Sequence, residues 1–380
     1  MMTWETLLLR DNNSLGAGDS GDIDIKLPQD RAISRLLLTI RNKNGSTSNT
    51  DDDGALETVV NSISEIKVTA GGGRVFKEYS GQACRDWATY AYGRNPYFFN
   101  TQVAGGTYPD GWQEAVFPIE FGRSGVLYDE LCALPAPLYK SLELKIKFDF
   151  TVGAADGFTT GSHKYDLVAE VLPLKSKEAL QNMRVIEQHK KDEDISKSSG
   201  VESYSLTTDP GGDKFLRQVM VSCYETGIAE GVDVTLAELE VNSASVAKDD
   251  WNRWQWRNAL DCRLKFLQII DSCYLDDASH VLRTEIPAVQ PQMVAQDAGT
   301  EDAYLSTAGD KVTIAGGSAG ENVALAMHSP VIPRCIFMDF DKDASLRNMI
   351  PQDSKDITLK LTHGGADGAI EIHEMSVVPP

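Results

Sequence analysis

The chain has 380 residues, of which 42% are hydrophobic, and its 36 basic and 56 acidic residues give a formal charge of −20 at pH 7. A single hydrophobic core stops growing near ~250–300 residues, so this length predicts two domains. The negative charge repels phosphate over most of the surface, which argues against nucleic-acid binding as the main task. No apolar run approaches the ~20 residues that span a bilayer, and the start of the chain lacks the basic region and cleavage site of a signal peptide. We therefore expect a protein that is made and matures inside a cell.

From the N-terminal end, segments alternate apolar and polar residues with period two, and clusters of Gly, Asp, Asn and Ser separate them. Six such segments cover residues 32–42, 62–70, 73–81, 115–123, 141–152 and 164–174. This pattern predicts an all-β protein, and the spacing of the segments favours a sandwich over a parallel α/β sheet. We expect a first domain over residues 1–174.

A charged stretch follows this first domain. Ala179, Met183 and Ile186 recur there at helical spacing among many charged side chains. We interpret residues 175–199 as a charged linker that is partly helical. Strand-like segments then resume at 214–225, 232–244, 333–341, 356–363 and 369–378. They predict a second domain over residues 200–380.

The second domain carries a long insertion at about 259–332. Its first part is compatible with a helix, since Leu264, Leu267 and Ile270 share a helical face, and its last part is rich in Gly, Ala and Asp. Closing a longer loop costs only ~0.6 kcal/mol per doubling of its length, so long insertions are tolerated at loop tips. We expect residues 297–322 to form an exposed projection on the second domain, with a loop that pads a subunit contact as the alternative.

The two halves match weakly but in the same order, as an internal duplication predicts. The matches pair Arg35 with Arg217, Ile63 with Leu236, Ile66 with Leu239, residues 85–95 with 249–258, 119–121 with 338–340, and 141–146 with 356–361. Two similar sandwiches in one subunit give two similar faces, and three such subunits around a threefold axis form a near-hexagonal tile.

On these residues the sequence resembles the double jelly-roll major capsid proteins of tailless icosahedral viruses, often membrane-containing, of the tectivirus, corticovirus and adenovirus-hexon lineage. The resemblance is carried by residues 62–81, 117–123, 128–136, 141–150 and 338–361. It implies two tandem eight-stranded antiparallel jelly-roll β-sandwiches with short flanking helices, which Tyr128–Ala133 and Ala344–Met349 could supply.

The resemblance also implies a structural role. The chain would trimerise into pseudo-hexagonal capsomers that tile an icosahedral virion shell, after assembly in the host cytoplasm. Its partners would be further copies of itself and penton and minor capsid proteins, with an internal lipid membrane left open and no direct genome binding. The main alternative is a carbohydrate-binding β-sandwich, such as a lectin or a viral spike or receptor-binding protein. A glycan-cleaving enzyme on a jelly-roll scaffold is a third hypothesis, for which the sequence shows no paired carboxylates.

One aromatic cluster is a candidate binding site. Trp251, Trp254 and Trp256, interleaved with Arg253 and Arg257, could stack on sugars or bases. We favour the structural interpretation, in which Trp254 and Trp256 alternate into the sandwich and the arginines lie at a subunit boundary.

The remaining polar motifs predict no catalytic, cofactor-binding or metal-binding residue. Asp51–Asp53, and separately Asp339, Asp341 and Asp343, could hold Ca²⁺, but both lack the glycine and bidentate glutamate of an EF-hand, so solvated loops are favoured. Glycines at 71–73 and 316–317 have no Gly-Lys-Ser/Thr after them and suit hairpins or bulges. The histidines, which form no recognisable nucleophile site, are His163, His189, His280, His328, His363 and His373. The cysteines, which we expect to be buried free thiols, are Cys84, Cys132, Cys223, Cys262, Cys273 and Cys335.

Overall fold

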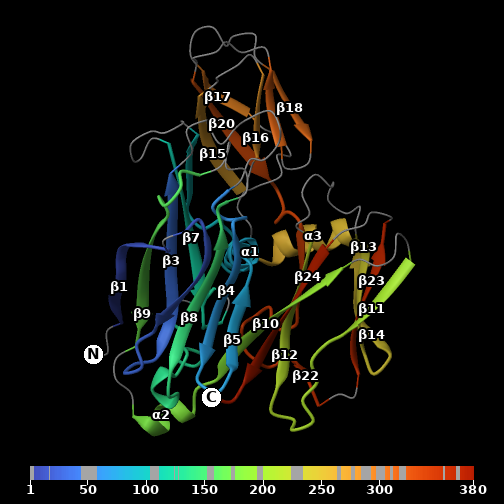
Figure 1. The fold of residues 1–380 in the computed structure, drawn as a ribbon. Coiled ribbons are helices and arrows are strands. Elements are labelled where there is room, and N and C mark those ends of the chain that lie inside the picture. Colours follow the sequence, from blue (N-terminus) through green and yellow to red (C-terminus); the bar gives the residue numbers. More distant parts are fainter. Residues whose placement is uncertain are drawn as a thin grey trace.

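A computed structural model shows two antiparallel β-sandwiches side by side, with a smaller β-rich unit beyond their upper end (Figure 1). The structure describes residues 4–16, 18–43, 58–102, 111–123, 125–126, 128–151, 158–172, 176–194, 200–223, 234–262, 267–274, 279–283, 292–296, 304–308, 311–315, 322–353, 356–364 and 369–380. The predicted all-β fold with two tandem jelly rolls is confirmed.

Two sheets form the first sandwich. One sheet contains, side by side, β1 (Glu5–Ser14), β9 (Lys164–Val171), β3 (Ile33–Lys43), β7 (Trp112–Glu120) and β6 (Phe98–Gln102). The other contains β2 (Ser20–Lys26), β8 (Leu142–Asp149), β4 (Ile63–Ala70) and β5 (Arg74–Tyr79). Alternate side chains of β3, such as Leu36 and Leu38, are buried between the sheets, which is the period-two pattern that the sequence predicts.

The second sandwich repeats this arrangement. Its first sheet contains β10 (Val185–Asp194), β24 (Ala369–Val378), β12 (Phe215–Ser222) and β21 (Cys335–Asp339), and β22 (Ile350–Pro351) also pairs with β12. Its second sheet contains β11 (Gly200–Ser205), β23 (Ile357–His363), β13 (Val234–Val241) and β14 (Ala244–Asp250). The strand order of each sheet matches that of its counterpart in the first sandwich, so the duplication is structural.

The strand registers refine the predicted alignment of the halves. In the first sandwich, Arg35 is the first residue after a bulge in the pairing of β3 with β9, and in the second sandwich Gln218 is the first residue after a bulge in the pairing of β12 with β24. Arg35 therefore corresponds to Gln218 and not to Arg217. A second pair of bulges makes Ala237, not Leu239, the counterpart of Ile66. Bulges insert a residue without leaving a clear mark in the sequence, and a slip of one residue exchanges the two faces of a strand. The predicted matches of 119–121 with 338–340 and of 141–146 with 356–361 agree with the registers.

A flanking helix follows the equivalent hairpin in each sandwich. These are α1 (Gly81–Tyr92), which follows β5, and α3 (Trp251–Asp261), which follows β14. Ser80 and Asp250 cap the two helices by accepting hydrogen bonds from backbone N–H groups of the first turn. Both tryptophan-bearing segments are therefore helical, and the helical period buries Trp251 and Trp254 but leaves Trp256 exposed. The prediction that Trp254 and Trp256 both enter the sandwich is wrong.

The expected flanking helices at Tyr128–Ala133 and Ala344–Met349 are turns and bends instead. Tyr128, Ala344 and Leu346 have positive φ angles of 57°, 52° and 60°, which a right-handed helix does not accommodate. A single 3₁₀ turn, η1 (Ala136–Leu138), lies just after the first segment.

The charged segment between the halves also differs from the expectation. It begins with the short helix α2 (Lys177–Gln181), but Val185–Asp194 form the strand β10, which pairs along its whole length with β24 at the end of the chain. Ile186, expected on a helix, lies on this strand. The pairing joins residues far apart in sequence, so the local pattern did not reveal it.

The insertion of the second half forms the upper unit in Figure 1. Its strands are β15 (Leu267–Tyr274), β20 (Asn322–Ser329) and β17 (Gln292–Gln296) in one sheet, and β16 (Ser279–Arg283), β19 (Lys311–Ala315) and β18 (Tyr304–Ala308) in another. The expected helix around Ile270 is thus strand β15, while Leu264 lies outside the described residues. β15 pairs in parallel with β6, so the insertion extends a sheet of the first sandwich although it belongs to the second half.

The two hydrophobic cores meet at the contact between the sandwiches. The first core includes residues of the second half, among them Met220, Phe337 and Met375. The second core is built from Val219, Leu239 and their neighbours. Among the described residues, no helix is both long and apolar enough to cross a membrane.

Candidate functional site at the junction of the two sandwiches

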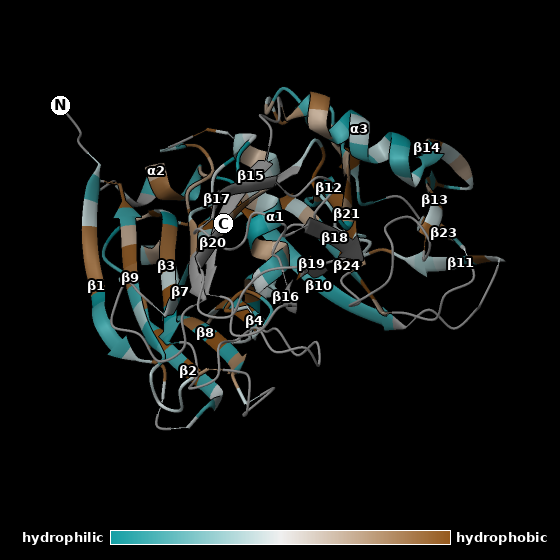
Figure 2. Ribbon diagram, turned by 90° about the horizontal axis from the view of Figure 1, so that it is seen from above, coloured by the Kyte–Doolittle hydropathy of each residue, from teal (hydrophilic) through white to brown (hydrophobic). Residues whose placement is uncertain are grey.

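The junction forms where β5 and α1 of the first sandwich pack on the outer face of the sheet β10–β24–β12–β21. Seen from above, α1 lies between the two sandwiches (Figure 2). Ile336 and Met338 point into the second core, so the alternation of the strand turns Phe337 toward α1. Phe337 stacks on Tyr90 at 4.3 Å between ring centroids and contacts the edge of Trp87 at 5.0 Å.

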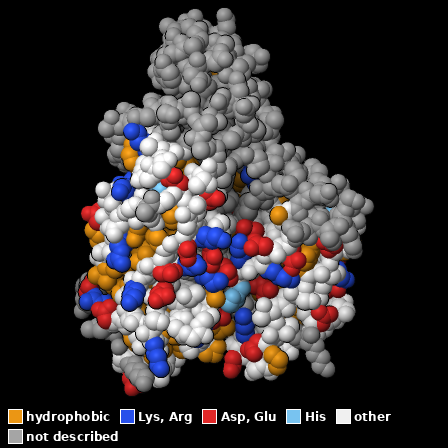
Figure 3. Space-filling model, viewed as in Figure 1, with side chains coloured by type: hydrophobic (Ala, Val, Ile, Leu, Met, Phe, Trp, Pro, Cys, Tyr) orange, Lys and Arg blue, Asp and Glu red, His pale blue; other side chains and the backbone are white. Residues whose placement is uncertain are grey.

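Hydrogen bonds from four side chains of the first half reach across this contact. Arg74 donates to Glu187 at 2.7 Å and to the backbone oxygen of Pro379 at 2.9 Å. Ser80, the N-cap of α1, donates to Glu371 at 2.8 Å. Tyr90 donates to Asp339 at 3.2 Å, and Arg123 donates to the backbone oxygen of Ala344 at 2.9 Å. Acidic and basic side chains accordingly lie close together over β5 and β10 (Figure 3).

Two cations are fully buried beside this contact. Arg217 on β12 donates from Nε to Asp341 at 3.1 Å, and both side chains are at most 1% exposed. Lys77 on β5 is 1% exposed, and its ammonium lies 6.0 Å from the ring centroid of Phe121. Burial, reinforced by the charge of Arg217, lowers the pKa of Lys77 from 10.5 to about 7. An amine with this pKa is protonated in about half of the molecules at pH 7, whereas a solvated lysine is fully protonated there.

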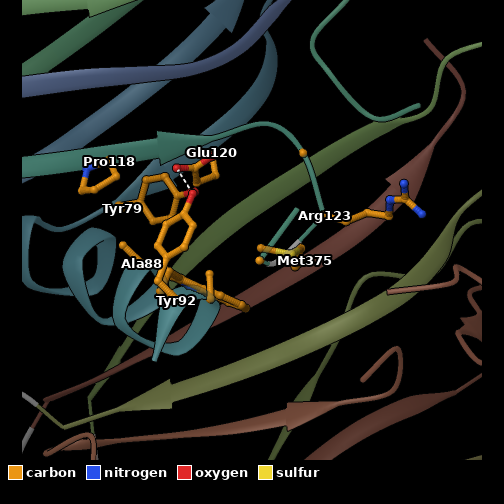
Figure 4. Close-up of a pocket in the computed structure, with 11 residues that line it drawn as sticks. Tyr79, Ala88, Tyr92, Pro118, Glu120, Arg123 and Met375 are labelled. Carbon is orange, nitrogen blue, oxygen red and sulfur yellow. Dashed lines mark hydrogen bonds between the residues drawn. The ribbon is translucent and has the colours of Figure 1, made fainter. Parts of the chain in front are cut away.

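A small cavity opens beside α1 at the same junction. Figure 4 shows Tyr79 and Tyr92 pointing toward one another near Glu120, while Arg123 points away. Tyr92 donates a hydrogen bond to Glu120, and burial raises the pKa of both groups. The cavity has a volume of about 20 Å³, which has room for a water molecule and not for an organic ligand. The cavity is a packing feature of the junction.

The predicted carboxylate cluster does not converge. Asp341 binds Arg217 and the backbone N–H of Leu346, Asp339 accepts from Tyr90, and Asp343 accepts from the backbone N–H of Ser345. The solvated-loop interpretation is therefore wrong for Asp341, which is 1% exposed. Asp51–Asp53 lie outside the described residues. Within the described part of the chain, no three His, Cys, Asp or Glu side chains are placed to hold a metal ion.

The other motifs occupy structural positions. Gly72 and Gly73 have φ angles of 94° and 87° in the hairpin between β4 and β5, as their sequence predicts, and Gly316–Gly317 lie outside the described residues. His163 bonds the backbone oxygen of Gly18 at 2.8 Å, and His373 bonds Glu371 at 3.1 Å. No disulfide joins the described cysteine side chains, which exclude that of Cys273. That the chain has no catalytic or cofactor-binding residue stays a prediction.

Sequence reasoning did not identify the residues that join the sandwiches. Arg74, Ser80, Lys77 and Phe337 bind partners that are distant in sequence. Ser80 is of a residue type that commonly begins a helix, and this N-cap is the local signal that could have placed α1.

Comparisons with known proteins agree on the fold. No family model and no curated protein matches the sequence. Among solved structures, the STIV MCP is 11% identical with a TM-score of 0.61, and the match covers 100% of this chain and 97% of that one. The major capsid protein P2 of bacteriophage PM2 is 10% identical with a TM-score of 0.56, covering 99% and 97%. The PBCV-1 virus capsid protein is 9% identical with a TM-score of 0.53, covering 99% and 93%.

The chain has the double jelly-roll fold of viral major capsid proteins. The matches span both sandwiches and almost the whole of each compared chain, so the likeness is to the complete tandem arrangement. At these identities the likeness concerns the fold, and function is argued from the molecule itself.

Proposed function

We propose that this protein is the major capsid protein of an icosahedral virus, with a structural and not an enzymatic role. The observation that carries the proposal is the duplication of a sandwich: the strand order β1–β9–β3–β7 recurs as β10–β24–β12–β21, and β2–β8–β4–β5 recurs as β11–β23–β13–β14. A shell tile uses both sandwiches of each chain as equivalent sides of one near-hexagonal outline.

The subunit would trimerise into pseudo-hexagonal capsomers. Two similar sandwiches per chain give a ring of six similar units when three chains surround an axis. Its partners would be neighbouring capsomers and penton and minor capsid proteins, with an internal membrane as a further candidate. Its location would be the virion, after assembly in the host cytoplasm. The boundaries 1–174 and 200–380 would be those of the two jelly rolls, with β10 contributing to the second.

The carbohydrate-binding alternative relied on the tryptophan cluster. Trp251 and Trp254 are buried and do not form a stacking platform for a sugar. Trp256 alone is exposed, at 56%, which supports a contact with another protein surface better than a glycan site.

Sedimentation tests the proposal. The purified chain should sediment as a species of three times the chain mass, because a shell subunit buries large contacts, on the order of 2,000 Å² or more. A strict monomer at high protein concentration and at several salt levels would contradict it.

A further inference from the structure

The outer face of α3 exposes large apolar side chains. Trp256 is 56% exposed and Leu260, one helical turn later, is 79% exposed. Val246 on β14, the strand that leads into α3, is 50% exposed. Figure 2 shows α3 at the periphery of the second sandwich. We call these three residues the α3 ridge.

The corresponding positions of the first sandwich are buried. β5 pairs with β4, and β14 pairs with β13 in the same way. Each pairing has one bulge at the equivalent position, and the extra residue is Phe76 in the first and Val246 in the second, so these two residues correspond. Counted from the N-caps Ser80 and Asp250, Asp86 corresponds to Trp256 and Tyr90 to Leu260. Phe76, Asp86 and Tyr90 are only 0%, 4% and 5% exposed. The second sandwich covers this flank of the first, because Tyr90 packs on Phe337 and Asp339 and β5 packs beside β10, whereas the three equivalent residues of the second sandwich are exposed.

The surface that covers α1 also has an uncovered counterpart. A row of neighbouring residues crosses the outer face of β24, β12 and β21, and its members, His373, Met220 and Phe337, are fully buried under the first sandwich. The equivalent row crosses the outer face of the first sandwich's larger sheet. Its members are Leu8, Val168, Leu37 and Pro118, which we call the receiving row. Leu8 is 61% exposed, and Val168, Leu37 and Pro118 are partly exposed.

A hollow lies at the end of the receiving row. Arg35, Tyr92, Tyr97 and Pro118 line a depression of about 460 Å³. At the equivalent place on the second sandwich, Tyr90 stacks on Phe337 and donates to Asp339. The strand registers make Pro118 the counterpart of Phe337 and Glu120 the counterpart of Asp339. The hollow is thus where a side chain from another flanking helix would be seated.

We infer that the α3 ridge of one copy docks on the receiving row of a second copy of this chain, with Leu260 seated in the hollow beside Pro118. The contact repeats between chains the packing that α1 makes within the chain. The α3 ridge and the receiving row are different surfaces of the chain, so the contact is head to tail. Such a contact closes into a ring of three chains when each chain is rotated by one third of a turn relative to the previous one. This inference rests on the proposed function and names the surfaces through which the capsomer would form.

Two variants test the ridge. Trp256→Glu/Leu260→Glu changes only exposed side chains, so its circular dichroism spectrum and melting temperature should match those of the parent chain. Its trimer-to-monomer midpoint concentration should rise at least ~10-fold in analytical ultracentrifugation, as expected when central aromatic and aliphatic contacts are lost. Val201→Glu is the matched control, because Val201 is 50% exposed on β11, away from α3, and should leave the midpoint unchanged.

Mixing experiments test the direction of the contact. Leu37→Glu places a charge in the receiving row and should raise the trimer-to-monomer midpoint concentration in the same way, so that both variants are monomeric below their raised midpoints. A mixture of the Leu37→Glu chain with the ridge variant should form heterodimers, because one intact ridge and one intact row remain between them. A mixture that stays monomeric, or a ridge variant that trimerises like the parent chain, overturns the inference while leaving the proposed function standing. A parent chain that is itself monomeric overturns the proposed function instead.

Discussion

At the scale of single residues, the junction concentrates buried charge. Lys77, Arg217 and Asp341 are each at most 1% exposed, and the carboxylate of Asp341 accepts a hydrogen bond from the guanidinium of Arg217. Burying an ion requires a partner, and removing that partner leaves a charge without solvent or counter-ion. The stability of the junction should therefore respond strongly to changes at these positions.

Asp341→Asn should be strongly destabilising. It leaves the guanidinium of Arg217 buried without its carboxylate, which costs about 3–5 kcal/mol of unfolding free energy. Urea unfolding at neutral pH measures this loss. The control is Asp343→Asn, two residues away on an exposed side chain, which should leave the urea midpoint unchanged; equal midpoints for the two variants would show that the buried pair is unimportant.

Lys77→Met should stabilise the protein at pH 7. Because the pKa of Lys77 falls from 10.5 to about 7 on folding, the unfolded chain binds more protons between these values, and stability should rise as the pH rises from about 7 to 10.5. Methionine removes this penalty, on the order of 2–4 kcal/mol, and flattens that part of the pH profile. Thermal midpoints at pH 7 and pH 10 measure both effects. Lys147→Met, at an exposed position of β8, should keep the parent profile, and a parent profile in Lys77→Met would refute the assignment.

At the scale of secondary-structure elements, the strands with clear period-two alternation were predicted correctly, from β3 and β4 to β23 and β24. Elements whose structure depends on distant partners were not. β10 reads locally as a charged helix, but its ten paired residues complete a sheet edge beside β24. α1 and α3 were missed because aromatic residues are common in strands, whereas the N-caps Ser80 and Asp250 begin helices.

Phe337→Ala should loosen the attachment of α1. Truncating a buried phenylalanine costs about 3–5 kcal/mol, and here it removes the ring that contacts Trp87 and Tyr90. Hydrogen exchange should accelerate at the α1 amides beyond the effect of lower global stability. Leu359→Ala, in the second core, is the control for global destabilisation. If both variants change α1 exchange equally, Phe337 has no special role in the junction.

The insertion is an element that should be separable from assembly. We expect deletion of Thr300–Gly320, which removes β18 and β19, to leave trimers intact, since β15 keeps its pairing with both β20 and β6. Limited proteolysis should then show altered surface accessibility. Loss of trimers in gel filtration would make the insertion an interface element and not a projection.

At the scale of the whole molecule, the tandem fold was predictable because the repeat preserves the order of its elements. The junction was not, since it depends on side chains such as Arg74 and Phe337 whose partners lie in the other half. The same asymmetry underlies the proposed assembly. Within the chain, the flank of the first sandwich at α1 is covered by the outer face of the second sandwich. The equivalent flank, which carries the α3 ridge, and the equivalent face, which carries the receiving row, remain exposed.

Electron microscopy of the purified protein would show directly whether this chain forms shell tiles. Class averages should show trimers with a near-sixfold outline, made of six similar densities around one axis, or sheets tiled by such trimers. Particles of one subunit, or symmetric dimers related by a twofold axis, would contradict the account of this chain as a shell tile.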